Sequence, residues 1–542
     1  MRKGEMMKTT SFEMAFIIRV FMNGERLFCI LGLVDEDLIE EAASPVPRRR
    51  RAIGRAAAAA ACAVLVCGAG LAWLVTGGFR GYGSSAPGES GSGIAHESEP
   101  LGSEGTAFMS YAGPVFPLAT TEEAPGLTAE RTITWDFAPG AYEDGSLRQW
   151  GAAVTDRYVL TNSTDSSLAV TALYPFAGSF RELASQLPTV TVDGAAAAST
   201  LYAGGYAGGF RDAGLGDGST WNLEYPDIWT DYRALLEDGS YLERALGNGP
   251  SLDIPVTVYE FTDSQAPAGH DAATQAITFT IDQEKATVLT YGFNGSSWDT
   301  ETGWRQYSYF VPNGQRRDTD PKLLAVLGED IGTYTLGGYE NGACEAELDG
   351  VSCTVTRRET TLDAVLDLLC RAYLETQADW QWGMTGEETA AVPYALFRRA
   401  AAELLVQYGV LAESDTVDRY ANGRLDDILS EAMSQQRVLY LAVPVTIPAG
   451  NTLELTFTLW KEPSFDYGCS GSENVGLQGY DLVTRLGSTL DFTAQTAALV
   501  HTEAIELVRD NFGFDLASGV TEAKLDPEAE HYYLEIRPIA SD

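Results

Sequence analysis

The chain has 542 residues, a formal net charge of −40 and 45% hydrophobic residues, so it can bury a substantial core. Its acidic excess repels nucleic acid and anionic lipid, which excludes a nucleic-acid partner from our expectations. Residues 1–79 carry ten Lys and Arg against eight Asp and Glu, whereas residues 80–542 carry 26 against 68. The ordinary interpretation of this excess is a solvated surface, because no stretch has the D-x-D-x-D-G spacing of a calcium-binding loop.

Residues 1–55 are expected to form a short cytoplasmic tail that begins at Met1, Met7 or Met22. Beyond residue 22, apolar side chains recur at the spacing of a short amphipathic helix, at Leu27, Ile30, Leu31 and Val34. About 25 residues cannot form a core of their own. Two interpretations stay open: a flexible tail, or a docking helix at residues 22–47 that binds a cytoplasmic protein partner.

Residues 56–75 read AAAAAACAVLVCGAGLAWLV, without a charge or a proline. This length crosses about 30 Å of hydrocarbon, and we predict one transmembrane helix over residues 56–77. Five arginines precede it, and after it only Arg80 appears before Arg131. The five are Arg48, Arg49, Arg50, Arg51 and Arg55. By the positive-inside rule, the protein is expected in a bacterial cell membrane with the N-terminus inside and the large domain outside.

A cleaved signal peptide is the rival interpretation of the apolar segment. Its basic leader would then be 55 residues long, which is far longer than such leaders are. Residues 78–127 follow the segment and are expected to form a spacer. They are rich in Gly, Ser and Glu up to residue 105 and in Pro thereafter.

Residues 128–358 have the period-two pattern and the turn signals of a β-rich ectodomain. Short strands are expected at residues 168–173, 189–194, 256–261, 277–281 and 287–293. The stretch TVTVDG at 189–194 ends in an Asp-Gly hairpin signal. Between the strands, residues 228–246 have a helical pattern.

Residues 359–437 change to a helical period and predict a helical insertion. Three helices are indicated by apolar residues at helical spacing. The first is marked by Leu362, Val365, Leu366, Leu369 and Tyr373, the second by Tyr394, Phe397, Ala401, Leu404 and Leu405, and the third by Leu425, Ile428, Leu429 and Met433.

Strands resume over residues 438–542. In NTLELTFTLW, apolar residues 453, 455, 457 and 459 alternate with polar ones, the pattern of a half-buried strand. A last strand is indicated by Tyr532, Leu534 and Ile536. The predicted fold class is therefore α+β and mainly β: a sandwich-like ectodomain with a helical insertion, behind one N-terminal transmembrane helix.

Four of the seven cysteines follow the apolar segment: Cys344, Cys353, Cys370 and Cys469. They permit two disulfides with three connectivities. Cys370 lies in an apolar helical pattern, where a buried free thiol is the commoner outcome.

The stretch CEAELDGVSC is a hairpin candidate with Asp349-Gly350 at its tip. A four-residue loop would place Cys344 opposite Cys353, within reach of a disulfide. A two-residue loop would place Cys353 opposite Ala346 instead. Both registers stay open, and the Cys344–Cys353 bond is a candidate only.

The sequence contains no G-x-S-x-G motif of serine hydrolases, no phosphate-binding GxxxxGK[ST] motif and no dinucleotide-binding GxGxxG motif after a strand. The four histidines are isolated from other metal ligands in the sequence. We therefore expect no catalytic, cofactor-binding or metal-binding residues and no cofactor. Two clusters have a ligand-contacting interpretation beside the structural one. They are the loop AGGYAGGF at 203–210 and the aromatic group Trp298, Trp304, Tyr307 and Tyr309.

Four stretches resemble a group of uncharacterised single-pass envelope proteins of clostridial gut bacteria. They are LGLVDEDLIEEA before the arginines, YVLTNSTDSSLAVTALYPFAGSF at 158–180, VTIPAGNTLELTFTLWK at 445–461 and GYDLVTRLGSTLDFTAQTAAL at 479–499. The resemblance implies an envelope location and no particular activity. The order of inner helix, basic stop and single span is also similar to the layout of membrane-bound anti-sigma factors, although no H-x-x-x-C-x-x-C zinc motif is present.

These observations favour a membrane-anchored extracytoplasmic protein that binds an unknown extracellular ligand or senses the state of the envelope without catalysis. One alternative is an anti-sigma-like regulator in which residues 22–47 hold a cytoplasmic factor. A second alternative is a cryptic extracellular hydrolase, because two carboxylates at the right separation would escape a motif search.

Overall fold

A computed structural model describes the chain at residues 110–111, 113–141, 147–148, 150–206, 240–312, 321–379, 386–407, 424–466, 476–526 and 528–539. The chain divides into two units, Met1–Glu104 and Gly105–Asp542, and all described residues belong to the second. The predicted tail, its arginines at 48–51 and 55, and the predicted transmembrane helix at 56–77 lie outside the described residues, as does Cys469. Within the described residues, no helix is both long and apolar enough to span a membrane.

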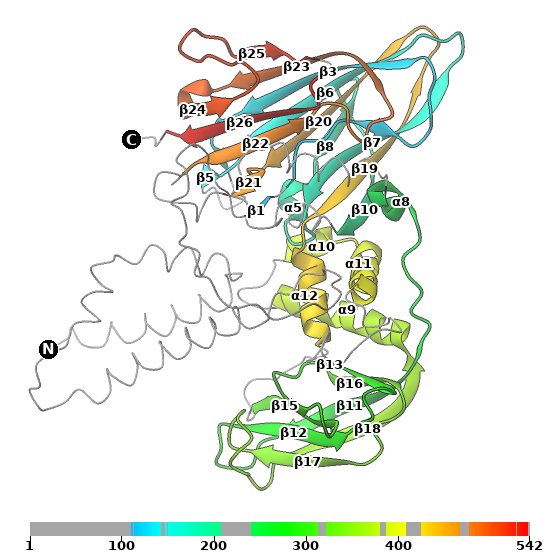
Figure 1. The fold of residues 1–542 in the computed structure, drawn as a ribbon, viewed down its shortest axis with the longest axis vertical. Coiled ribbons are helices and arrows are strands. Elements are labelled where there is room, and N and C mark those ends of the chain that lie inside the picture. The colour runs from blue at the N-terminus through cyan, green and yellow to red at the C-terminus, as the bar shows by residue number, and fades with distance from the viewer. Residues whose placement is uncertain are drawn as a thin grey trace, which may run out of the picture. The chain divides into compact units, whose positions relative to one another are not determined.

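The described part is mainly β, with several sheets and a group of helices, which confirms the mainly β class (Figure 1). We call the strands before α8 and after α12 the large β-domain, and β11 to β18 the small β-domain. The large β-domain is therefore built from two distant parts of the sequence.

A seven-stranded sheet forms the centre of the large β-domain. Its order is β25 (Glu522–Lys524), β23 (Asp491–Val500), β3 (Leu127–Asp136), β6 (Ala152–Asn162), β20 (Thr452–Lys461), β8 (Thr189–Val192) and β9 (Ala195–Ala196). All its pairs are antiparallel except β3 with β23. Burial alternates along β3, β6 and β20, as the period-two pattern predicts for a sheet with one face in the core.

Two further sheets belong to the same hydrophobic core. One has the order β1 (Ser110–Tyr111), β21 (Phe465–Asp466), β22 (Gln478–Val483), β26 (His531–Pro538) and β24 (Ile505–Asp510). The other has the order β10 (Thr200–Tyr206), β19 (Arg437–Ile447), β7 (Leu168–Gly178) and β2 (Ala119–Thr120), and a small pair joins β4 (Gly140–Ala141) to β5 (Leu147–Arg148). The rings of Tyr174 in β7 and Phe457 in β20 stack with centroids 4.1 Å apart, so β7 packs on the seven-stranded sheet.

The small β-domain has two four-stranded sheets. One has the order β13 (Ala286–Tyr291), β16 (Lys322–Gly328), β11 (Pro255–Gln265) and β18 (Ser352–Thr361). The other has the order β14 (Gly295–Asp299), β15 (Trp304–Pro312), β12 (Ala272–Thr280) and β17 (Tyr334–Tyr339). In β16, Leu324 and Val326 join the core between these sheets, whereas Leu323 and Ala325 join the core that contains the helices. Both faces of β16 are thus buried, which explains its unbroken apolar sequence.

The three predicted helices are confirmed as α9 (Leu362–Asp379), α11 (Tyr394–Gln407) and α12 (Leu425–Ser434). Shorter helices are α5 (Leu183–Gln186), α8 (Ser240–Leu246), α10 (Gly386–Ala391) and the 3-10 helix η2 (Thr502–Ala504). Of the helix predicted at 228–246, α8 is described and residues 228–239 lie outside the described residues.

The expected strands are also present, as parts of β7, β8, β11, β12, β13, β20 and β26. The Asp-Gly signal is confirmed as a tight hairpin between β8 and β9. Asp193 and Gly194 both adopt positive φ, 49° and 78°, as a type I′ turn requires.

The predicted spacer at 78–127 is wrong at its C-terminal end. Val115, Phe116 and Leu118 are buried, and β2 pairs with β7. The composition of this stretch suggested a linker, but Val115 and Leu118 belong to the hydrophobic core. The interruption of the large β-domain is also longer than the predicted insertion at 359–437, because the small β-domain precedes the helices within it.

Candidate functional site

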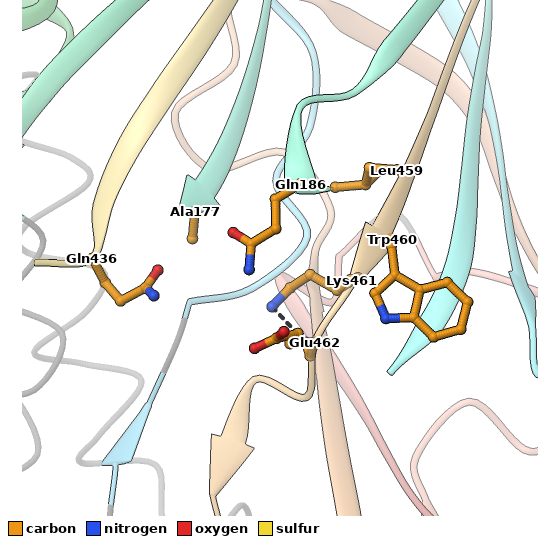
Figure 2. Close-up of a pocket in the computed structure, with 7 residues that line it drawn as sticks. All are labelled: Ala177, Gln186, Gln436, Leu459, Trp460, Lys461 and Glu462. Atoms are coloured by element: carbon orange, nitrogen blue, oxygen red, sulfur yellow. Dashed lines mark hydrogen bonds between the residues drawn. The ribbon is translucent and has the colours of Figure 1, made fainter. Parts of the chain in front are cut away.

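A small pocket opens beside the C-terminal end of β20. Figure 2 shows the residues that line it: Ala177, Gln186, Gln436, Leu459, Trp460, Lys461 and Glu462. They come from the end of β7, from α5, from the residue before β19, from β20 and from the residue that follows β20. The pocket therefore gathers side chains that lie far apart in the sequence.

Lys461 enters the pocket because of the alternation along β20. Residues 453, 455, 457 and 459 of this strand face the core, and Lys461 is next in the same phase. Its side chain is buried, and its Nζ donates to the backbone oxygen of Glu462 at 2.9 Å. A lysine is thus held where the pattern calls for an apolar residue.

The burial of Lys461 has an electrostatic consequence. Loss of solvation lowers the pKa of its ammonium to about 8, although the negative charges of Asp481, Glu462 and Glu182 act in the opposite direction. A substantial fraction of this side chain is consequently neutral in mildly alkaline solution. Lys461 is the buried cation of the pocket.

Glu462 and Arg148 lie on one side of Lys461. Burial and the charge of Glu182 raise the pKa of the Glu462 carboxyl, while Arg148 acts to lower it. The Arg148 guanidinium is 3.5 Å from a Glu462 carboxylate oxygen and lies 4.9 Å from the centroid of the Trp460 ring. The indole of Trp460 in turn donates to the backbone oxygen of Trp150 at 2.9 Å.

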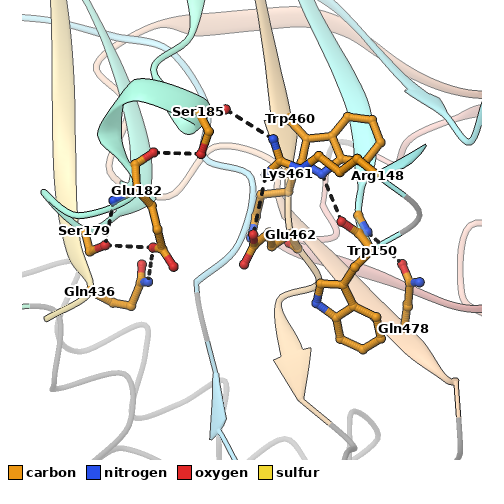
Figure 3. Close-up of polar contacts among 11 residues, drawn as sticks. Arg148, Trp150, Ser179, Glu182, Ser185, Gln436, Trp460, Lys461, Glu462 and Gln478 are labelled. Atoms are coloured by element: carbon orange, nitrogen blue, oxygen red, sulfur yellow. Dashed lines mark hydrogen bonds and ion pairs between the residues drawn. The ribbon is translucent and has the colours of Figure 1, made fainter. Parts of the chain in front are cut away.

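Glu182 lies on the other side, where its carboxylate is held by two donors (Figure 3). Ser179 Oγ donates to it at 2.7 Å, and Gln436 Nε2 donates to the same oxygen at 2.9 Å. The pocket and its surroundings thus contain two carboxylates, Glu182 and Glu462, and two cations, Lys461 and Arg148. The formal charges of these four side chains cancel, and Asp481 adds a further negative charge that acts on Lys461.

Gln186 is the one lining residue with a buried polar atom that lacks a partner among the described residues. Only 7% of its surface is exposed, and its Oε1 accepts no hydrogen bond. Figure 2 shows its amide directed into the pocket with the Lys461 side chain. A buried acceptor without a partner costs about 1–3 kcal/mol, so this oxygen is a vacant position for a donor.

The pocket volume of about 20 Å³ is room for one water molecule or for one small polar group of a larger molecule. The site can therefore hold a single functional group between a cation and a vacant acceptor. It supports recognition of a group at the surface rather than enclosure of a whole ligand.

The structure does not support the candidate disulfide. Asp349-Gly350 forms a turn as predicted, but residues before it do not pair with β18: Glu347 bridges to Tyr339, and β18 pairs with β11. Cys344 and Cys353 are free thiols.

The separation of the two thiols has a simple cause. The Cys344 thiol contacts Ser308, and the Cys353 thiol contacts Tyr309. Successive residues of β15 point to opposite faces of their sheet, so the two cysteines lie on opposite sides of it. The prediction assumed one hairpin and could not include this third strand. Cys370 is buried and free, as the sequence indicates.

The four residues of the aromatic group do not form one cluster in the structure. Tyr307 and Tyr309 belong to the core of the small β-domain, whereas Trp298 is exposed and Trp304 is half-buried. The loop AGGYAGGF begins within β10, and its residues 207–210 lie outside the described residues.

Two of the described histidines contact carboxylates. His501 Nδ1 lies 2.6 Å from Asp136 Oδ1, and His531 Nε2 lies 3.1 Å from Asp481 Oδ2. Within the described ranges, no group of three or more His, Cys, Asp or Glu side chains is arranged to hold a metal ion.

None of the residues that line the pocket was identified from the sequence as part of a functional site. One signal was available for Lys461, which continues the apolar phase of the clearest strand in the chain. Gln186 had no comparable signal, since α5 is a four-residue helix whose packing depends on strands elsewhere in the sequence.

Comparisons with known proteins bear on the whole chain rather than on the pocket. No protein-family model matches the chain, and no curated protein matches it.

Proposed function

We propose that the chain is a single-pass membrane protein with its N-terminus inside, whose sandwich-like outer domain binds a ligand or senses the envelope without catalysis. The observation that carries this proposal is the uncharged segment at 56–75, preceded by five arginines. Its location would be a bacterial cell membrane, with residues 78–542 outside.

The pocket supports a binding role. Two of its lining side chains are held by hydrogen bonds that do not involve a ligand: Lys461 donates to the backbone oxygen of Glu462, and Gln436 donates to Glu182. A preorganised site loses little entropy on binding. The acidic surface of the outer domain would also keep it soluble and away from anionic lipid.

A reporter fusion tests the topology. An alkaline phosphatase fused after Asp542 should be active, and a β-galactosidase at the same position should be inactive. Replacing Arg48, Arg49, Arg50 and Arg51 with Asn should reduce the phosphatase signal, because those charges hold the N-terminus inside. A fusion that is active only as β-galactosidase would reject the proposal.

A cytoplasmic partner is a second element of the proposal. The helical spacing of Leu27, Ile30, Leu31 and Val34 would suit a docking helix, as in an anti-sigma-like regulator. Affinity purification with residues 22–47 should then recover one protein, and Leu31→Asp should abolish its recovery. Equal recovery of that protein by the unmodified segment and by its Leu31→Asp variant would argue against a cytoplasmic partner.

One observation favours the hydrolase as a second candidate. Burial and the charge of Glu182 raise the pKa of Glu462, and a carboxyl with a raised pKa is what a glycosidase uses as its general acid. Chromogenic aryl glycosides would detect such an activity. Turnover that Glu462→Gln abolishes would favour the hydrolase over the non-enzymatic function.

A further inference from the structure

We propose that the pocket at Lys461 binds one hydroxyl group of a saccharide, with Trp150 as an apolar contact for the sugar ring. This inference rests on the proposed function, because an outer domain is the part of the protein that meets envelope saccharides. It names the ligand class that the proposed function leaves open.

The hydrogen-bonding groups of the pocket select a group that both donates and accepts. Gln186 Oε1 needs a donor, and Lys461 Nζ has protons left after its bond to Glu462. An ammonium ion could donate to Gln186 but could not accept from Lys461. A carboxylate could accept from Lys461 but could not donate to Gln186. A hydroxyl group does both.

The charges around the pocket also favour a neutral ligand. An anion at Lys461 would meet Glu462 and Glu182, and a cation at those carboxylates would meet Lys461 and Arg148. Since an ion of either sign would meet like charges here, little net electrostatic attraction rewards its desolvation. A neutral group does not incur that desolvation cost.

The size of the pocket and the exposure of Trp150 give the rest of the ligand a place. A volume of about 20 Å³ admits one hydroxyl group and leaves a sugar ring outside. Trp150 does not itself line the pocket, but it is 41% exposed, and its backbone oxygen accepts from the indole of Trp460, which does line it. An exposed indole presents an apolar face on which the C–H groups of a sugar can pack.

Binding is measured on the full-length protein in lipid nanodiscs, because glycoside detergents would compete. The probes are cellobiose, chitobiose, maltose and lactose, with glycerol as a hydroxyl probe that has no ring. Saturation-transfer NMR is expected to show saturable binding of at least one disaccharide with a Kd on the order of millimolar, and weaker binding of glycerol.

Two glutamine variants distinguish recognition from general damage. Gln186→Leu removes the vacant acceptor and should weaken binding at least about tenfold. Gln435→Leu is the matched control: Gln435 has an equally buried Oε1 without a hydrogen-bond partner but does not line the pocket, and binding should be unchanged. Trp150→Ala should weaken disaccharide binding more than glycerol binding.

The proposal is overturned if no disaccharide saturates by about 50 mM, a result that leaves the pocket to an ordered water alone. Undiminished binding in Gln186→Leu would overturn it as well. Either result leaves the reporter fusions untouched, so a failure of the ligand class is distinguishable from a failure of the membrane topology.

Discussion

At the scale of single residues, the buried pair Arg131–Asp156 holds the large β-domain together. Arg131 donates to both Asp156 oxygens, at 2.9 and 2.7 Å, and neither side chain is exposed. It also donates to the backbone oxygens of Val483 at 2.8 Å and Phe116 at 3.0 Å. One guanidinium thus joins β3 and β6 to the segment before β2 and to the end of β22.

Removing one member of this pair leaves a buried charge without its partner. We expect Arg131→Met to lower the free energy of unfolding by about 3–5 kcal/mol. Arg157→Met is the control, because Arg157 pairs with Glu454 at the surface and should change stability by less than about 1 kcal/mol. Urea unfolding of both variants measures the difference, and equal losses would contradict the role given to burial.

Lys461 gives a second prediction at this scale. Its folded pKa of about 8 lies below the unfolded value of 10.5. Protonation of Lys461 therefore destabilises the folded state. The free energy of unfolding is highest, as far as this residue is concerned, above pH 10.5, and this contribution is lost as the pH falls through about 8. Lys461→Met should stabilise the protein at pH 7, by up to about 3 kcal/mol, and by little at pH 10.5.

Urea unfolding at several pH values measures this gain. The exposed Lys285 is the control, and Lys285→Met should change stability little at any of these pH values. A gain for Lys461→Met that does not change with pH would show that the ammonium is not desolvated in the folded protein.

At the scale of elements, Asp426 joins helix α12 to the small β-domain. Both its carboxylate oxygens accept from the backbone N–H of Gly292, at 3.1 and 3.2 Å. Burial raises the pKa of this carboxyl to about 6, against the effect of the Gly292 hydrogen bond and of Arg424, and the neighbouring Asp427 adds to the rise. The contact thus contains a group that titrates in weakly acidic solution.

The sign of the pH dependence follows from this raised pKa. The stability contributed by the protonated Asp426 is fully present below pH 3.8 and is lost as the pH rises through about 6. Asp426→Asn should therefore stabilise the protein at pH 7 by about 1–2 kcal/mol and leave it unchanged at pH 4. Thermal unfolding of the variant and the unmodified protein at the two pH values measures this difference. Destabilisation by Asp426→Asn at pH 7 would mean that the hydrogen bond from Gly292 to the charged carboxylate stabilises more than the burial of that charge costs.

The segment that enters the large β-domain gives another prediction. Val115, Phe116 and Leu118 are buried, and burial of such side chains stabilises by roughly 1.5–3 kcal/mol each. A fragment of residues 105–542 should unfold cooperatively, and a fragment of residues 128–542 should be less stable by several kcal/mol. Equal melting temperatures would show that this segment does not contribute to the fold.

The sequence predicted the elements whose signal is local. Helices α9, α11 and α12 follow from apolar residues at helical spacing, and β20 follows from its alternation. The turn at Asp193-Gly194 follows from the backbone conformations that this pair tolerates. The burial of residues 115–118 could not be predicted, because a short apolar stretch between prolines has no periodicity.

At the scale of the whole molecule, the pairing of strands is what the sequence left open. The parallel pair of β3 with β23 joins residues 127–136 to residues 491–500. Any alternating strand could take either place, because the period-two pattern does not specify a partner. The pocket has the same cause, because its residues come together only once the sheet of β7 and β19 packs on the sheet that contains β20.

The candidate disulfide failed for the same reason at this scale. Local spacing allowed Cys344 to face Cys353, but β18 pairs with the distant β11 and leaves the hairpin unformed. A local geometric argument was correct about the turn at Gly350 and wrong about the partner strand.

The central claim is that residues after the apolar segment lie outside the membrane, and protease accessibility in intact cells tests it most directly. A tag placed after Asp542 should be digested when protease is added to spheroplasts, while a tag before residue 22 should survive until the membrane is lysed. Protection of the C-terminal tag in intact spheroplasts, with digestion only after lysis, would contradict the account.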